Sequence, residues 1–373
     1  MKKLGFGLMR LPLLDPDDKA SVDLEQTKDM VDSFLAQGFT YFDTAWMYCK
    51  FESERATREA LVERYPRDRF TLATKLHAGY LKCAEDRDRI FNEQLKKTGA
   101  QYFDYYLLHA LSRELYEKYN EFDCFEWLKE KKKAGLVRNI GFSFHDSAEF
   151  LEQVLTEHPE MEFVQLQINY LDWDSNGIQS RLCYETATRH GKPVIVMEPV
   201  KGGTLASLPP AAEKLLRSIH PDWSIPSWAI RFAASLDNVI TVLSGMSNTA
   251  QLADNTAYMQ RFEKLNQEEL NALKQVVDIL NSGSAIPCTG CAYCVDGCPM
   301  NIPIPTYFSL YNADLQEKAD KDWKPQEAYY SNLSTEDGKA RSCIECGQCE
   351  AVCPQHLPII RHLKEVANYF EEQ

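Results

Sequence analysis

The chain has 373 residues, a formal net charge of −14, 44% hydrophobic and 26% charged residues, and 12 cysteines. These values are typical of a folded globular protein rather than a disordered one, and the acidic balance argues against a nucleic-acid binder. No apolar run approaches the roughly 18 residues of a membrane span. Arg10, Pro12 and Asp15 come too early for a signal peptide, so we expect a cytoplasmic protein that binds neither nucleic acid nor membrane.

Short apolar runs alternate with amphipathic stretches over the first three quarters of the chain. Residues 5–12 have the pattern of a hairpin that precedes the first strand. Helices are expected at 53–65, 88–98 and 148–158. Strands are expected at 39–42, 69–75, 102–109, 137–144, 164–169, 193–198, 240–244 and, as a short eighth strand, 256–259. About eight β/α units in series close most simply into a (β/α)8 TIM barrel, an α/β fold.

A last helix of this domain is predicted over residues 266–282. Asn266 is its expected N-cap, with Glu269 at the third helical position, and Gly283 ends it. We therefore expect the barrel to occupy residues 1–283 and a small, mostly α-helical domain to occupy residues 284–373. The alternative for the first domain is an open doubly wound sheet, which is disfavoured because no Gly-x-Gly-x-x-Gly follows the first strand.

Eight of the 12 cysteines form two identical runs near the end of the chain, each with the spacing C-x2-C-x2-C-x3-C-P. This spacing is typical of two-cluster bacterial ferredoxins, in which the fourth cysteine of a run serves the other cluster. We therefore expect two [4Fe–4S] clusters, one held by Cys288, Cys291, Cys294 and Cys353 and the other by Cys343, Cys346, Cys349 and Cys298. The alternative, two zinc sites, usually needs two ligand pairs set farther apart.

Four polar residues lie at or just after the ends of successive expected strands. Asp43 ends the first, Tyr48 follows it in the loop, Lys75 ends the second and His109 ends the third. The active site of a (β/α)8 barrel is built at the carboxyl ends of its strands. A single such residue could simply meet solvent, but four of these types in succession predict an active site.

Several segments resemble the aldo-keto reductase family. They are Phe42-Asp43-Thr44-Ala45 with Tyr48 and Ser53-Glu54, Ala73-Thr74-Lys75, Leu107-Leu108-His109, Gly141-Phe142-Ser143, Gln167-Ile168-Asn169-Tyr170, Ser244-Gly245-Met246-Ser247-Asn248 and Asp254-Asn255. The resemblance covers about residues 1–282, and with its cysteine-rich tail the whole chain is similar to the ferredoxin-tailed branch of that family. It implies a barrel, a catalytic tetrad of Asp43, Tyr48, Lys75 and His109, and a nicotinamide cofactor bound without a Rossmann unit.

The tetrad suits the reduction of an aldehyde or ketone. Hydride addition to a carbonyl leaves an oxyanion that must gain a proton. Tyr48 is the expected proton donor; its ordinary pKa is near 10, and the Lys75 ammonium is expected to lower that pKa by favouring the phenolate. Asp43 would hold Lys75, and His109 would orient the carbonyl oxygen by a hydrogen bond.

The resemblance also implies a set of cofactor residues. Ser143 and Gln167 match positions that hold the nicotinamide carboxamide. The loop with Glu198, Lys201 and Gly202 is expected near the pyrophosphate, and the following segment near the adenosine phosphate, through Gly245, Ser247, Asn248, Gln251 and Asn255. Residues 237–260 contain no Lys or Arg and Gln251 replaces an expected arginine, which weakens a preference for NADPH over NADH unless Lys201 compensates. The alternative for Ser247 and Asn248 is ordinary helix capping.

The two domains carry different electron chemistry. Nicotinamide transfers hydride, whereas iron–sulfur clusters pass single electrons, so direct exchange would need a splitter such as a flavin, for which the sequence has no pattern. The clusters could connect the barrel to an external ferredoxin or flavoprotein, accept electrons from a substrate radical or bound flavin, or stabilise the fold. We expect the second domain to cover part of the active-site entrance, and the charged stretch 317–324 to be a docking surface or an exposed helix.

Two functions remain open at this stage. The first is an NAD(P)H-dependent reductase of a small carbonyl substrate, with an appended iron–sulfur domain. The second is an electron-transfer or redox-sensing module whose barrel binds a ligand without turning it over. The complete tetrad favours the first.

Overall fold

Eight parallel strands form a closed barrel in the computed structural model, which describes residues 2–317 and 324–371. Each strand pairs with its neighbours in chain order, and β8 closes the barrel on β1. The strands are β1 (Leu4–Gly7), β2 (Tyr41–Asp43), β3 (Thr71–Leu76), β4 (Phe103–Leu111), β5 (Val137–Phe144), β6 (Phe163–Gln167), β7 (Val194–Met197) and β8 (Val239–Gly245). The predicted (β/α)8 fold is therefore confirmed, and the open sheet is excluded.

Two sequence predictions at the barrel seam are wrong. Residues 5–12 do not form a leading hairpin, because Leu4–Gly7 is the first barrel strand and pairs in parallel with β2 and β8. The expected eighth strand at 256–259 is the end of a helix, α11 (Thr249–Met259), whose buried residues recur at helical spacing. The strands that carry Asp43, Lys75 and His109 are consequently β2, β3 and β4.

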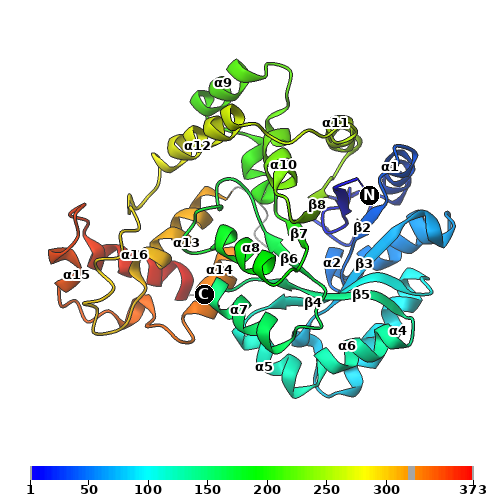
Figure 1. Cartoon of the computed structure of the whole chain (residues 1–373), viewed down its shortest axis with the longest axis horizontal. Helices are drawn as coiled ribbons and strands as arrows, with labels where there is room; N and C mark the ends of the chain where they lie inside the picture. Colours follow the sequence, from blue (N-terminus) through cyan, green and yellow to red (C-terminus); the bar gives the residue numbers. More distant parts are fainter. Residues whose placement is uncertain (1, 318–323, 372–373) are drawn as a thin grey trace.

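Helices and short helical turns surround the barrel (Figure 1). Several α-helices begin where a side chain accepts a hydrogen bond from the first turn, as Asp23, Ser112, Ser147, Asn248 and Asn266 do. The helices are α1 (Leu24–Ala36), α2 (Tyr48–Phe51), α3 (Ser53–Thr57), α4 (Glu85–Thr98), α5 (Arg113–Glu121), α6 (Cys124–Lys133), α7 (Ala148–Glu157), α8 (Ser180–Arg189), α9 (Pro210–Ile219), α10 (Ile225–Ser235), α11 and α12 (Gln267–Asn281). The shorter turns are η1 (Arg58–Val62), η2 (Arg67–Arg69), η3 (Ala78–Tyr80) and η4 (Lys201–Ala206). The capping box predicted for Asn266 and Glu269 is present at α12.

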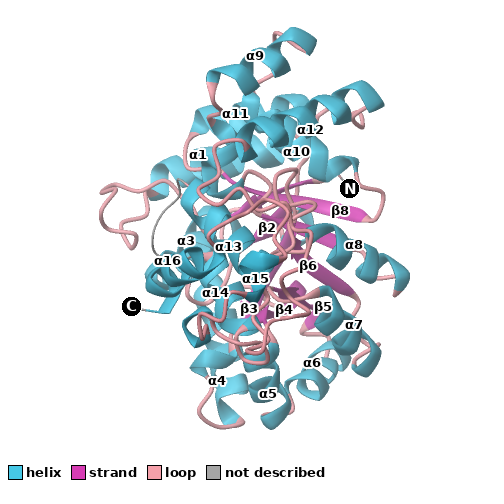
Figure 2. Ribbon diagram, turned by 90° about the vertical axis from the view of Figure 1, so that its left-hand side faces the viewer, coloured by secondary structure: helices cyan, strands magenta, loops and turns pink. Residues whose placement is uncertain are grey.

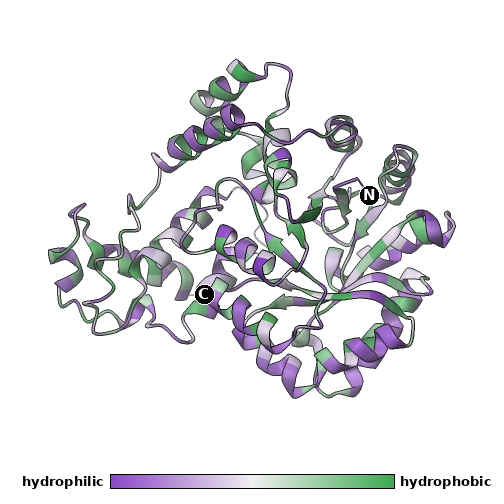
Figure 3. Cartoon of the chain, in the orientation of Figure 1, coloured by the Kyte–Doolittle hydropathy of each residue, from purple (hydrophilic) through white to green (hydrophobic). Residues whose placement is uncertain are grey.

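Apolar side chains form separate cores inside and outside the barrel. The inner core is small and includes Tyr41, Leu107, Phe163 and Ile195. The larger core lies between the strands and the surrounding helices, whose hydrophilic residues gather on their outer faces (Figure 3). In the described part of the chain, no helix has the length and apolar character that crossing a membrane requires.

The residues after α12 form a second unit with a core of its own, centred on Tyr307, Phe308, Leu310 and Leu363. Its elements are α13 (Ile304–Gln316), α14 (Pro325–Leu333), η5 (Ala340–Ser342), α15 (Gln348–Ala351) and α16 (Ile359–Glu371). The unit lies to one side of the barrel in Figure 1, and Figure 2 views the barrel from that side. Of the charged stretch at 317–324, only the two end residues are described, so that prediction lies outside the described residues.

The second unit rests on loops that follow the carboxyl ends of the barrel strands. After β4, Arg113 pairs with Glu336 at 2.7 Å. After β5, the backbone oxygen of His145 accepts a hydrogen bond from the Asn332 amide at 2.8 Å. After β6, the hydroxyls of Ser175 and Ser309 lie 3.0 Å apart. These contacts agree with the expectation that the second domain covers part of the barrel entrance.

Candidate active site

Lys75 and Asp43 form a buried ion pair at the ends of adjacent strands. The Lys75 side chain has no exposed surface, its ammonium contacts the Asp43 carboxylate, and it also donates to the backbone oxygen of Thr44 at 2.8 Å. The other oxygen of Asp43 accepts from the amide of Gln165 at 3.3 Å. A buried charge without a partner would be expensive, so this arrangement fixes the ammonium in one place.

The Tyr48 ring lies over that ammonium. The Lys75 nitrogen is 4.9 Å from the ring centroid and also interacts with the hydroxyl. Tyr48 is followed by Cys49, Lys50 and Phe51, all three in the left-handed region of the backbone. Non-glycine residues rarely adopt this conformation in succession, and it turns the chain sharply just after Tyr48. Such strain is often found at functional sites.

The His109 ring packs edge-to-face against the Tyr48 ring. The two ring centroids are 5.7 Å apart in an edge-to-face arrangement, and His77 contacts His109 at 5.5 Å. Burial lowers the pKa of His109 well below its ordinary value, with further contributions from Lys75, His77 and His145. His109 is therefore a neutral imidazole near pH 7. Its Nδ1 is buried and makes no hydrogen bond among the described residues, so it is available to a ligand.

The protonation of the tetrad is set first by burial. Burial raises the pKa of Tyr48 above its ordinary value, and the Lys75 ammonium opposes this without cancelling it. We expected Lys75 to lower the pKa of Tyr48; its effect has that sign, but the net direction is upward. Burial also raises the pKa of Asp43. For Lys75, burial lowers the pKa, but Asp43 and Tyr48 outweigh it, so the net pKa is raised and the ammonium keeps its proton.

The expected carboxamide-binding residues lie on the next two strands. Ser143 is in β5, where its hydroxyl accepts from the backbone of Ala110 at 2.8 Å. Gln167 ends β6, and its amide nitrogen donates to Asp172 at 3.1 Å. The amide oxygen of Gln167 is buried and has no hydrogen-bond partner in the described residues. Both side chains are buried, and the free oxygen is an acceptor that a bound amide could fill.

Lys201 already has a partner inside the protein. Its ammonium is buried and contacts both oxygens of Asp172, at 2.8 and 3.0 Å. Asp172 also accepts from Asn169 at 2.8 Å. This pairing occupies the charge that we considered as a replacement for the missing arginine in the adenosine-phosphate segment.

The loop after β7 has the backbone of an anion-binding turn. Glu198, Lys201, Gly202 and Gly203 all have positive φ, and the Glu198 carboxylate accepts from the backbone N–H of Gly202 at 2.7 Å. The same carboxylate lies 3.8 Å from the guanidinium of Arg10. Backbone N–H groups in such turns bind anions.

The last expected cofactor segment lies at the start of α11. Asn248 caps this helix by accepting from the backbone of Gln251 at 2.9 Å, so the capping role that we considered is present. The backbone N–H of Ser247 donates to the Gln251 side chain at 2.7 Å, and its hydroxyl donates to the backbone oxygen of Arg10 at 3.0 Å. Asn255 is buried and donates to Ser244 at 3.0 Å. A Cβ on Gly245 would meet the Arg10 side chain at 3.2 Å.

Sequence reasoning missed three groups at this site: Arg10, Asp172 and the side chains of α14. Arg10 follows β1 and reaches the loops after β7 and β8; recognising residues 4–7 as a strand would have placed it at a carboxyl end. Asp172 and the α14 residues carried no motif, because their partners are distant in sequence.

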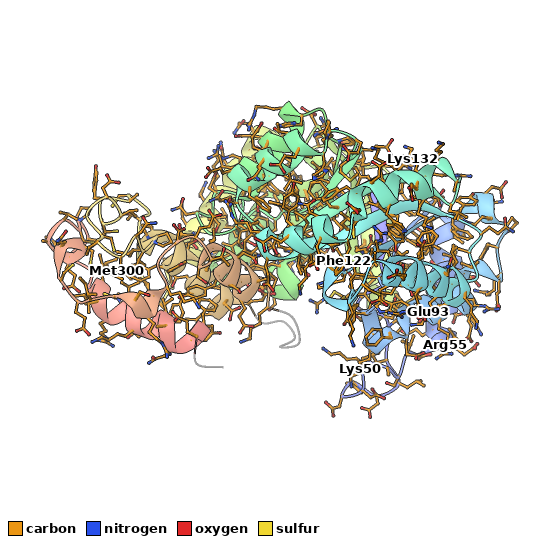
Figure 4. All side chains as sticks on the ribbon, turned by 90° about the horizontal axis from the view of Figure 1, so that it is seen from below. Lys50, Arg55, Glu93, Phe122, Lys132 and Met300 are labelled. Carbon is orange, nitrogen blue, oxygen red and sulfur yellow. The ribbon has the colours of Figure 1, made fainter. Side chains whose placement is uncertain are left out.

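The eight clustered cysteines line two separate hollows in the second unit. One is lined by Cys288, Cys291, Cys294 and Cys353, and the other by Cys298, Cys343, Cys346 and Cys349. Met300, which also lines the second hollow, lies in the part of the chain that projects from the barrel (Figure 4). Within the described residues, no three His, Cys, Asp or Glu side chains converge as a single metal ion would require.

The barrel with its polar tetrad and the unit with its cysteine-lined hollows define an oxidoreductase barrel joined to an iron–sulfur unit. Comparison with known proteins agrees with this class. Residues 3–278 match the Aldo/keto reductase family and residues 287–358 match the 4Fe-4S dicluster domain. The chain therefore belongs to the Aldo/keto reductase family and carries a 4Fe-4S dicluster domain after the barrel.

Individual relatives resemble one or the other part. The aldo-keto reductase AKR11C1 of Bacillus halodurans in its holo form has a TM-score of 0.60 and 23% identity over 74% of this chain and 91% of its own. An aldo/keto reductase of Klebsiella pneumoniae in complex with NADP and acetate has a TM-score of 0.59 and 18% identity over 74% of this chain and 91% of its own. An uncharacterized iron-sulfur protein of Methanococcus maripaludis, MMP1067, is 29% identical over 108 residues, which are 28% of this chain and 20% of that protein.

Proposed function

We propose that this protein reduces an aldehyde or ketone with NADPH or NADH, and that Tyr48 donates the proton. The observation that carries the proposal is that Tyr48 contacts both the Lys75 ammonium, 4.9 Å from its ring centroid, and the His109 ring, whose centroid lies 5.7 Å away. A carbonyl that accepts hydride needs an acid, a cation and a hydrogen-bond donor for the developing oxyanion. Tyr48, Lys75 and His109 would supply these in turn.

The raised pKa of Tyr48 is compatible with this role. A phenol that keeps its proton at neutral pH is loaded before each turnover. The alkoxide formed from a carbonyl is a far stronger base than phenolate, so transfer from Tyr48 is downhill. The phenolate left behind is then stabilised by the Lys75 ammonium, and Asp43 holds that ammonium in position.

A nicotinamide dinucleotide fits the residues at the mouth of the barrel. The free acceptor on Gln167 and the free Nδ1 of His109 are buried polar atoms that a ligand would satisfy. Gly202 and Gly203 supply a turn of positive φ without side chains, and a Cβ added at Gly203 would meet nothing within 4 Å. When bound, the dinucleotide would supply the hydride. Ser143, Glu198, Gly245, Ser247, Asn248, Gln251 and Asn255 remain predicted contacts.

In the second domain we propose two [4Fe–4S] clusters that share cysteines between the runs. The lining of the two hollows supports the pairing, because each contains three thiols of one run and the last thiol of the other. The partner of these clusters is proposed to be a ferredoxin or flavoprotein, and a flavin in the barrel has no support from the sequence. A cytoplasmic location and the boundary between residues 283 and 284 also remain proposals.

Replacing Tyr48 by Phe tests the proposed reaction. The variant keeps the ring and its packing on His109 but lacks the hydroxyl group that would donate the proton. The carbonyl reduction rate at saturating NADPH or NADH should therefore fall about 10²–10⁴-fold. Dinucleotide binding, measured by fluorescence titration, should change little, which separates chemistry from binding. Undiminished reduction by this variant would remove Tyr48 from the mechanism. Binding without any turnover by the wild-type protein would favour the ligand-binding alternative.

A further inference from the structure

Helix α14 of the iron–sulfur domain presents one face to the barrel mouth. Gln326, Tyr329 and Asn332 recur every three residues and are all buried. The Tyr329 ring lies 5.9 Å from His145, after β5, and also interacts electrostatically with Asp172, after β6. Asn332 donates to the His145 backbone. Gln326 lies on the same face of α14, one turn before Tyr329.

Gln326 lies beside Glu317, which approaches the loop where the dinucleotide is expected. Glu317 lies beside Gln326 and is close enough to Lys201, Glu198 and Asp172 to interact electrostatically with them. Lys201 and Glu198 belong to the loop of positive φ after β7. Asp172 is hydrogen-bonded to Gln167, whose free amide oxygen lies in the same region. Residues of both domains therefore surround one polar site.

Polar atoms at this site lack hydrogen bonds of normal geometry. Gln326 has no exposed surface. Its side chain interacts with Glu317, but neither its amide nitrogen nor its amide oxygen has a hydrogen-bond partner of normal geometry within the described residues. One oxygen of Glu317 is likewise buried without such a partner. A buried amide without hydrogen bonds of normal geometry lowers the free energy of unfolding. A group that carries both donors and acceptors would satisfy it.

We propose that Gln326 binds the nicotinamide dinucleotide, so that the iron–sulfur domain completes the cofactor site of the barrel. This inference rests on the proposed function. Ribose hydroxyls and a carboxamide each carry a donor and an acceptor, as the Gln326 amide requires. The barrel alone would supply only part of the site, and the position of α14 would link cofactor binding to the integrity of the second domain.

Replacing Gln326 by Met gives a test with two readouts of opposite sign. Methionine has nearly the same shape and no amide, so the variant without dinucleotide should unfold about 2 °C higher than the wild-type protein, because an unpaired buried amide is gone. Its Kd for NADPH or NADH should rise about fivefold or more, because the ligand loses hydrogen bonds. Both are measured on anaerobically purified protein with its clusters loaded, by thermal unfolding and by fluorescence titration. A merely structural glutamine would lower stability when replaced and leave Kd unchanged.

Ser331→Ala is the matched control. Ser331 lies on the same helix and is exposed, so neither readout should change. An unchanged Kd in Gln326→Met, with wild-type protein that binds dinucleotide, overturns this inference and leaves the proposed function standing. If the wild-type protein binds neither NADPH nor NADH, the proposed function fails, and the inference fails with it.

Discussion

Lys75 shows how burial and charge are balanced at a single residue. Its side chain is fully buried, yet its pKa is raised because Asp43 and Tyr48 outweigh the effect of burial. His109, which is buried without a carboxylate partner, has its pKa moved far down instead. The same entrance therefore holds a cation beside an imidazole that is neutral near pH 7. In the proposed reaction, that combination would polarise a bound carbonyl without adding a second positive charge to the site.

The directions in which the pKa values of Tyr48 and His109 are shifted predict the pH dependence of reduction. The pKa of Tyr48 is raised and that of His109 is lowered, so neither group should titrate between about pH 6.5 and about pH 9, which lies between their ordinary values. The value of kcat/KM for the free enzyme should be flat in this range and should fall only at higher pH, as Tyr48 loses its proton. A profile over pH 5–11 at fixed ionic strength checks this. A fall centred near pH 6.5 would contradict the neutral assignment of His109.

At the scale of elements, local sequence patterns predicted most of the barrel but not its seam. Leu4–Gly7 alternates apolar residues with glycine, and that pattern suits a hairpin as well as a strand. Only the closed barrel distinguishes them, because a Cβ on Gly5 would lie 2.7 Å from the Leu243 side chain of β8. Likewise, Thr256 and Met259 are buried with Leu252 and Asn255 as one helix face, which a four-residue window cannot reveal. Closure and packing are properties of distant segments.

The candidate site also contains some residues that local sequence patterns predict and others that they do not. Asp43, Tyr48, Lys75 and His109 were predictable, because each follows a recognisable apolar run and the barrel brings such ends together. The electrostatic role of Lys75 was predicted with the correct sign, but the size of the burial effect depends on the packed structure. Arg10 and Asp172 were not predictable, since their partners Glu198 and Lys201 lie far away in the chain.

The sharing of cysteines between the two runs can be tested by spectroscopy. If Cys353 completes the first cluster, Cys353→Ser and Cys291→Ser should leave the same residual cluster and give matching EPR spectra after reduction. Cys298→Ser and Cys346→Ser should match each other in the same way. Cys83→Ser, at an exposed cysteine outside both runs, should keep the wild-type iron and sulfide content. A spectrum of Cys353→Ser that matches Cys346→Ser would show that each run holds its own cluster.

At the scale of the whole molecule, the iron–sulfur domain lies over the half of the barrel mouth formed by the loops after β4 to β7. Its contacts are an ion pair to Arg113, hydrogen bonds to His145 and Ser175, and the approach of Glu317 to Lys201. Ser143, Gln167 and Glu198 belong to the same half. Because an iron–sulfur domain covers this half of the barrel mouth, both hydride transfer and single-electron transfer have to be considered for this molecule.

The fate of deuterium from the cofactor distinguishes direct hydride transfer from single-electron transfer. The wild-type protein, with its clusters loaded, would be given NADPH or NADH that carries two deuterium atoms at C4 of the nicotinamide, together with a panel of aldehydes and ketones. Our account predicts that the new alcohol carries one deuterium on the former carbonyl carbon, because the hydride passes directly between the two carbons. An alcohol whose new C–H hydrogen comes from solvent would contradict direct hydride transfer and favour a route through the iron–sulfur clusters.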